Sequence, residues 1–312
     1  MQSNRTGAAL WLGFVLTLSS VTLQAASGLA FQMFAGPERS LGPNSVIVTS
    51  ADEALLIDTQ FLESDAAKLV AAVQATGKRL TTILITHAHP DHYFGLNVVR
   101  RTFPDARVFA RAAVRRVIAT EFLAKRVHWQ ELYAGDIPLT MTPPEELVGD
   151  TLTFADQPVR IVDLGVSESI DGTAFYFPDD RVFVAGDAVY SKFHAYQSDA
   201  NDQDAWIATL EAARKVGPID VVFPGHGPAG GPELFDALVK YLRDYQAVAR
   251  PGVRIADIAR EMARRYPDYP GGILLWVTRG PGFGLSGARE LGVPPELLGP
   301  PPAAAAPASD AR

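Results

Sequence analysis

The stretch Leu80-Thr-Thr-Ile-Leu-Ile85, followed directly by Thr86-His87-Ala88-His89-Pro90-Asp91-His92, decides the fold of this chain. The first six residues are apolar or β-branched and have the length of a buried strand. The residues from Tyr93 to Phe103 then show apolar side chains at helical spacing. Three of the chain's six histidines therefore lie on a strand-to-helix loop, which is where α/β proteins build their sites.

The spacing of these side chains predicts two metal positions. His87 and His89 point the same way if the backbone is extended. Asp91 and His92 then turn toward a second position nearby. A loop of solvated histidines is the alternative, and it is disfavoured because later segments supply matching ligands.

Those later ligands also follow apolar strands. Asp187 comes after Val182-Phe-Val-Ala-Gly186, and His226 stands between two glycines after Val221-Val-Phe. A carboxylate at the Asp187 position can bridge two metals, and His226 can complete the second one with Asp91 and His92. We predict Asp91 and Asp187 as the catalytic residues.

Together these motifs resemble the signature of the metallo-β-lactamase-fold hydrolases. The resemblance rests on the His87-x-His89-x-Asp91-His92 pattern, on the opening strands over residues 44–59, and on the Asp187 and His226 turns, in that order. It implies an α/β fold, a four-layer αβ/βα sandwich of two mixed β-sheets flanked by helices. It also implies two divalent metal ions, most often Zn²⁺, with Mn²⁺ or iron as alternatives.

The third ligand of the first metal departs from the family pattern. The family places a histidine ahead of a strand, and here the count back from the strand at residues 174–177 puts Glu168 in that place. Carboxylate oxygen is a good zinc ligand, and the alkylsulfatase branch also uses glutamate at this metal. The alternatives are that His194 replaces it, or that the first site is weak. With Glu168, the centre becomes more anionic and holds oxygen-preferring ions such as Mn²⁺ relatively better.

Other polar side chains are candidates for supporting roles. Asp58 is expected to orient a ligand histidine from behind. Tyr190 and His194, on the segment after Asp187, are candidate substrate-binding residues. His128 and Trp129 are interpreted as a packing pair and not as a pocket wall.

Composition and terminal segments indicate the organisation of the chain. The N-terminus has one arginine, a short apolar run and small residues near Ala25, which predicts a signal peptide over residues 1–25; an uncleaved anchor is the alternative. We expect a hydrolase domain over residues 26–290 and a Pro/Ala-rich disordered tail over residues 291–312. The net charge of -7 argues against nucleic acid as a partner. The absence of cysteine requires any zinc ligands to be histidine or carboxylate.

These observations predict a periplasmic or secreted hydrolase of small molecules, with no membrane association after cleavage. A hydroxide held by two metals would attack an ester, lactone or β-lactam bond. The alternatives are a sulfate- or phosphate-ester hydrolase, an iron-dependent oxidoreductase of the same fold, and a metal-binding protein without turnover.

Overall fold

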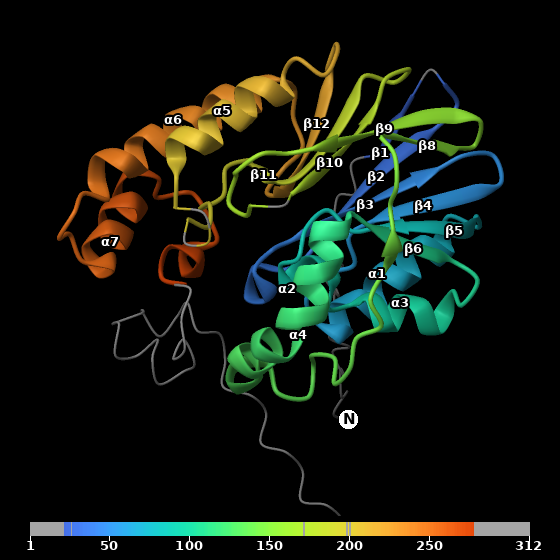
Figure 1. The fold of residues 1–312 in the computed structure, drawn as a ribbon, viewed down its shortest axis with the longest axis horizontal. Helices are drawn as coiled ribbons and strands as arrows, with labels where there is room; N and C mark the ends of the chain where they lie inside the picture. Colours follow the sequence, from blue (N-terminus) through green and yellow to red (C-terminus); the bar gives the residue numbers. More distant parts are fainter. Residues whose placement is uncertain (1–21, 26, 171, 198, 200, 278–312) are drawn as a thin grey trace, which may run out of the picture.

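Two β-sheets pack face to face, and helices cover both outer faces (Figure 1). The computed structural model describes residues 22–25, 27–170, 172–197, 199 and 201–277. The larger sheet has the strand order β1-β2-β3-β4-β5-β6-β7, and the smaller one has the order β12-β11-β10-β9-β8. Helices α1 to α4 lie on the larger sheet and α5 to α7 on the smaller one. The four-layer α/β sandwich expected from the sequence is confirmed.

The strands of the larger sheet are β1 (Thr22–Gln24), β2 (Ala30–Ala35), β3 (Asn44–Thr49), β4 (Glu53–Ile57), β5 (Arg79–Leu84), β6 (Arg107–Ala110) and β7 (Glu145–Glu146). The smaller sheet contains β8 (Thr151–Phe154), β9 (Gln157–Asp163), β10 (Thr173–Phe177), β11 (Val182–Tyr190) and β12 (Val221–His226). The α-helices are α1 (Glu63–Ala75), α2 (Pro90–Tyr93), α3 (Leu96–Thr102), α4 (Ala112–Tyr133), α5 (Gln203–Ala213), α6 (Glu233–Val248) and α7 (Ile255–Arg265). Two short 3₁₀ helices, Glu38–Ser40 and Gly272–Leu275, complete the fold.

Central strands read as unbroken apolar runs because both of their faces are buried. In β4, Leu55 and Ile57 join the core between the sheets, whereas Ala54 and Leu56 join the core under the helices. Phe31 meets Phe177 edge-on between the sheets, with ring centroids 4.9 Å apart. The central strands β4, β10 and β11 therefore offer no exposed polar face, whereas β8 and β9, at one edge of the smaller sheet, expose Thr151, Thr153 and Arg160.

Parallel pairing gathers those strand ends at one edge of the sandwich. β5 lies parallel to β4 and β6, and β12 lies parallel to β11. The sheets are joined beside this edge, because the backbone N–H of Thr173 donates to the Thr86 carbonyl at 2.9 Å. The Asn44 side chain also donates from β3 to the carbonyls of Pro224 and Gly227, at 2.9 and 2.7 Å.

Two expected strand ends differ from the structure. The strand that carries Asp187 does not end there but continues to Tyr190, because the chain goes on pairing with β12 after a register shift at Gly186. Likewise, β12 extends to His226 itself.

The predicted terminal segments lie largely outside the described residues. This holds for residues 1–21 of the expected signal peptide and for the expected tail. Residues 22–24 of the expected signal peptide form β1 and pair antiparallel with β2. Among the residues that the structure describes, no helix is both long and apolar enough to cross a membrane.

Candidate metal centre

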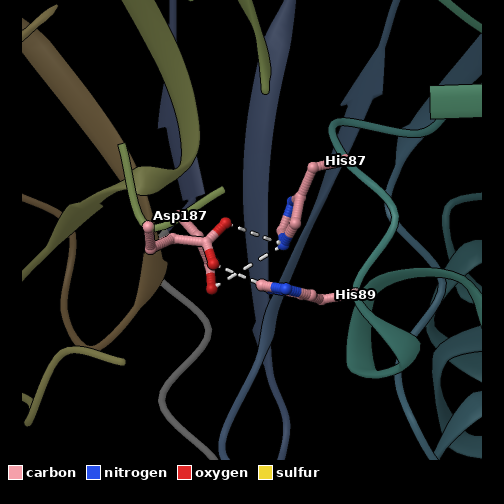
Figure 2. Close-up of side chains that lie close together, drawn as sticks. His87, His89 and Asp187 are labelled. Carbon is pink, nitrogen blue, oxygen red and sulfur yellow. Dashed lines mark ion pairs between the residues drawn. The ribbon is translucent and has the colours of Figure 1, made fainter. Parts of the chain in front are cut away.

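The loop after β5 and the end of β11 bring the first group of ligand-type side chains together. Figure 2 shows His87 and His89 pointing from that loop toward Asp187 on the opposite sheet. Glu168 completes the group, so that four side chains offer ligand atoms within 4.8 Å of one another. Glu168 Oε2 is 2.8 Å from His89 Nδ1, and its Oε1 is 3.4 Å from His87 Nε2.

A second group forms from Asp91, His92 and His226. His226 Nε2 is 3.4 Å from Asp91 Oδ2, and His92 Nε2 is 3.7 Å from the same oxygen. Asp187 connects this group to the first one. Its Oδ1 is 3.0 Å from His92 Nε2, and its Oδ2 is 3.2 Å from His226 Nε2 and 3.9 Å from His87 Nε2. A carboxylate in this position can contact two cations at once.

Two glycines allow Asp187 to sit where it does. Gly186 has φ +53°, a conformation that side chains disfavour, and it turns the strand just before the carboxylate. A Cβ atom on Gly225 would lie 1.8 Å from Asp187 Oδ1. The glycine before His226 is therefore required by the close packing of β12 against this carboxylate.

Asp58 organises the histidine loop from the end of β4. Its Oδ1 accepts from the backbone N–H of Thr86 at 2.9 Å, and its Oδ2 accepts from the Thr86 hydroxyl at 2.8 Å. His92 Nδ1 lies 2.8 Å from the same Oδ2. This contact leaves Nε2 of His92 free to face the centre, as expected of a carboxylate behind a ligand histidine.

A second carboxylate behind a ligand was not foreseen from the sequence. Asp199 Oδ2 lies 2.9 Å from His89 Nε2, and the hydroxyl of Tyr196 donates to Asp199 Oδ1 at 2.8 Å. Asp199 is 110 residues from His89 along the chain, so no spacing rule connects the two.

The structure treats the two candidate substrate-binding residues differently. Tyr190 lies at the centre: its hydroxyl donates to Asp187 Oδ2 at 2.5 Å, and its ring stacks on His226 at 4.9 Å. His194 lies elsewhere, with Nδ1 3.0 Å from the hydroxyl of Tyr241 on α6 and its ring also near Tyr269. His194 belongs to neither ligand group among the described residues, and Glu168 occupies the position for which His194 was the alternative.

The packing interpretation of residues 128 and 129 agrees with the structure. Trp129 is buried in the core and packs edge-on against Phe61, with centroids 5.3 Å apart. His128 is partly buried on the same helix, and burial lowers its pKa.

Burial and charge shift the pKa values of the centre in opposite directions. Burial raises the pKa of Asp187, but the histidines around it outweigh this and hold the pKa well below its usual range. Burial also raises the pKa of Glu168, and there it outweighs the nearby His89. Burial lowers the pKa of His226, but Asp187 and Asp91 outweigh it and raise the pKa to about 9. The protein alone thus gathers negative charge that protons or cations must balance.

The donor atoms fit divalent cations. His87 Nε2, His92 Nε2 and Asp187 Oδ1 are all buried without a hydrogen-bond partner. His92 Nε2 and Asp187 Oδ1 are only 3.0 Å apart but are not aligned as a hydrogen bond, which is the arrangement expected of atoms that share a cation. An unpaired buried polar group costs about 1–3 kcal/mol, so three of them facing one another call for ligation. Imidazole and carboxylate ligands suit Zn²⁺, Mn²⁺ and Fe²⁺.

Comparison with known proteins agrees with this geometry. The family model of the metallo-beta-lactamase superfamily matches residues 40–226. A hydroxyacylglutathione hydrolase of Rhodopseudomonas palustris is 28% identical over 127 residues, covering 41% of this chain and 41% of that protein. A metallo-beta-lactamase type 2 of Bacillus cereus is 23% identical over 191 residues, covering 60% of this chain and 68% of that one.

Among solved structures, a metallo-beta-lactamase from Pontibacter korlensis is similar in fold, with a TM-score of 0.58 at 19% identity. The match covers 72% of this chain and 99% of that structure. The chain spans less than half the length of the first curated relatives that it matches, between 41% and 48%.

The fold and the two ligand groups define the class of protein, an α/β sandwich of two sheets with a candidate two-metal centre at their strand ends. The chain belongs to the metallo-beta-lactamase superfamily.

Proposed function

We propose that this protein is an exported, dinuclear metal-dependent hydrolase of an ester, lactone or β-lactam. The observation that carries the proposal is the meeting of two ligand groups on one shared carboxylate, Asp187. When bound, two divalent ions would supply an acidified water as nucleophile and would polarise the bond under attack. His87, His89 and Glu168 would hold one ion, and Asp91, His92 and His226 the other.

The protein's own groups orient this centre. Tyr190 donates to Asp187 Oδ2 and fixes the rotation of the carboxylate. Burial, together with the charge of Asp187, raises the pKa of Tyr190 well above its usual value, so its phenol remains a hydrogen-bond donor at working pH. Its one O–H is taken by Asp187, so Tyr190 would support the reaction by orienting that carboxylate and not by donating to a substrate.

The charge near the loop favours neutral acyl substrates over sulfate or phosphate esters. In the described part of the chain, Lys125 of α4 is a cation that reaches the metal loop, and its Nζ donates to the Ala88 carbonyl at 2.6 Å. It also pairs with Glu121 at 3.3 Å, so its charge is already matched. An anionic ester would need a cation that is free to bind it. Two of the curated relatives are named as hydrolases of a hydroxyacyl conjugate and of a β-lactam, whereas another, from Streptococcus pneumoniae, is named as an exodeoxyribonuclease.

The test is a substrate panel on the purified protein, reconstituted with Zn²⁺ or Mn²⁺. The panel contains a lactone, an aryl ester, a β-lactam, an alkyl sulfate and a phosphodiester, and Asp187→Asn serves as the inactive control. We expect metal-dependent turnover of at least one acyl substrate. Turnover of the sulfate or phosphodiester alone would overturn the acyl assignment.

The cellular location of the protein is proposed on separate grounds. The apolar N-terminal run and the small residues near Ala25 support export to the periplasm or medium. Mass spectrometry of the exported protein should find a chain that starts near Ala26. Recovery of soluble cytoplasmic protein that retains Met1 would contradict this.

A further inference from the structure

We propose that the two halves of this centre are matched metal sites, which fill together with similar affinity instead of one after the other. Asp199 is the positioning residue that completes the match. The inference rests on the proposed metal-dependent function, but it concerns how the ions bind and not what the enzyme hydrolyses.

The inner ligands of the two halves have the same composition. The first half offers two imidazoles and one carboxylate, from His87, His89 and Glu168. The second half also offers two imidazoles, from His92 and His226, and one carboxylate, from Asp91. Asp187 serves both halves, because its two oxygens lie within 3.9 Å of histidines from each of them. Ligand charge and ligand type, which set the affinity for a given divalent ion, are therefore equal on the two sides.

The outer contacts repeat the match. In the second half, Asp58 Oδ2 lies 2.8 Å from Nδ1 of His92, the ring nitrogen that faces away from the centre. In the first half, Asp199 Oδ2 lies 2.9 Å from Nε2 of His89, the ring nitrogen that faces away from Glu168. A carboxylate in this position fixes the ring and makes the inner nitrogen a stronger donor. Each half therefore contains one histidine strengthened in this way.

The remaining histidine of each half lacks such a carboxylate. His87 Nδ1 lies 2.9 Å from the hydroxyl of Thr86, and His226 Nδ1 is buried without a hydrogen-bond partner. The surroundings are similar too, because every ligand side chain of both halves is at most 13% exposed. Nothing in these contacts favours one ion strongly over the other.

The two outer carboxylates reach their histidines by unrelated routes. Asp58 directly follows β4, next to the strand that carries the loop, whereas Asp199 belongs to the segment between β11 and α5. Tyr196 holds Asp199 through its hydroxyl, and the Tyr196 ring packs edge-on against His89 at 5.4 Å. Asp199 can therefore be altered without touching the other half.

The experiment is a titration of the metal-free full chain with Mn²⁺, followed by electron paramagnetic resonance. A lone Mn²⁺ gives a sharp six-line spectrum, and a neighbouring pair gives a broadened, coupled one. With two independent sites of equal affinity, about a quarter of the chains hold a pair at one ion per protein, so the coupled spectrum is already present at one equivalent. Filling in sequence would show only the lone-ion spectrum up to one equivalent.

Three variants test the cause. Asp199→Asn should weaken the first half by about 10- to 100-fold and convert the titration to sequential filling. Asp58→Asn should weaken the second half through His92, and the first half to a lesser extent, because Asp58 also holds Thr86, whose hydroxyl contacts His87. The double variant should bring the affinities of the two halves closer together than in Asp199→Asn alone, which a general loosening of the fold would not do. Asp220→Asn, on the surface beside Arg181, is the matched control and should titrate like the parent.

The outcomes separate the two proposals. Sequential filling of the parent chain, or an Asp199→Asn titration unchanged from the parent, overturns the matched sites while leaving the hydrolase intact. Failure of the folded chain to bind either Mn²⁺ or Zn²⁺ would overturn the metal-dependent function itself. If Asp58→Asn does not fold, as judged by circular dichroism, Asp199→Asn against its control carries the test alone.

Discussion

Replacing Glu168 by Gln should change stability with opposite signs in the metal-free and the metal-loaded protein. Glu168 is 1% exposed, and burial, against the opposing effect of His89, raises its pKa. When folding raises the pKa of a carboxyl group, the folded protein becomes less stable as the pH rises from the pKa of the unfolded state to the pKa of the folded state. Gln keeps the size of the side chain and removes that penalty, so the metal-free variant should be more stable than the parent at pH 7.5.

In the metal-loaded protein the sign reverses, because the variant loses one ligand and with it one ion. An ion present at 100 times its dissociation constant stabilises the folded state by about 2.7 kcal/mol. For a chain of this size, about 1 kcal/mol corresponds to roughly 2–4 °C in Tm, so the loaded variant should melt about 5–10 °C below the loaded parent.

The assay is thermal melting with a chelator and with Mn²⁺, together with metal counting by mass spectrometry. Glu168→His is the control: it should retain two ions, and its pH–rate profile should move to lower pH because the centre gains positive charge. If Glu168→Gln binds two ions and melts with the parent, Glu168 is not a ligand. If it is less stable than the parent in chelator as well, the reasoning about its burial is wrong.

Three further predictions concern other residues. Asp187→Ala should abolish hydrolysis and reduce bound metal while the far-ultraviolet circular dichroism stays unchanged, because a ligand and not core packing is lost. Gly225→Ala should have a similar effect on metal content, since the new methyl group would overlap the Asp187 carboxylate; Gly77→Ala, where a Cβ would meet nothing, is its control for the effect on the metal. Burial lowers the pKa of His194 to about 4, so folding favours its neutral form. The folded protein should therefore become less stable as the pH is lowered below about 6.5, the usual pKa of histidine. Between pH 7.5 and pH 5 the parent should lose about 2 kcal/mol more than His194→Gln in urea unfolding, and equal losses would show that His194 titrates normally.

The sequence was most informative where chemistry and local pattern coincide. The β5 run followed by three histidines located one wall of the centre, because a buried strand and a polar loop have opposite compositions. Glu168 was reached by counting back from the strand at residue 174. The segment between β9 and β10 is held locally, because the backbone N–H of Ser167 donates to the Ser169 carbonyl at 2.8 Å and the Thr209 hydroxyl donates to the Val166 carbonyl at 2.6 Å.

Contacts between side chains that come together through surface segments could not be predicted from the sequence. Asp199 is one example, because a single aspartate in a polar segment carries no signal of the histidine that it meets. His194 is the opposite case. It follows Asp187 by seven residues and was a candidate for the pocket, but the ring of Phe193 packs against His226 and His194 is directed to Tyr241. Closeness in sequence to a ligand is therefore weaker evidence than position at a strand end.

The segment that carries Glu168 is held in place on both sides, which argues against a metal site that has lost its function. The hydroxyl of Thr209 on α5 donates to the Val166 carbonyl at 2.6 Å, two residues before Glu168. On the other side, the backbone N–H of Thr173 donates to Thr86, on the histidine loop itself. The carboxylate is thus held between a helix and the opposite sheet, and its Oε1 and Oε2 face the two histidines of the first group. Such ordering in advance is what the ligand role proposed for Glu168 requires, because a preorganised site binds its ion more tightly.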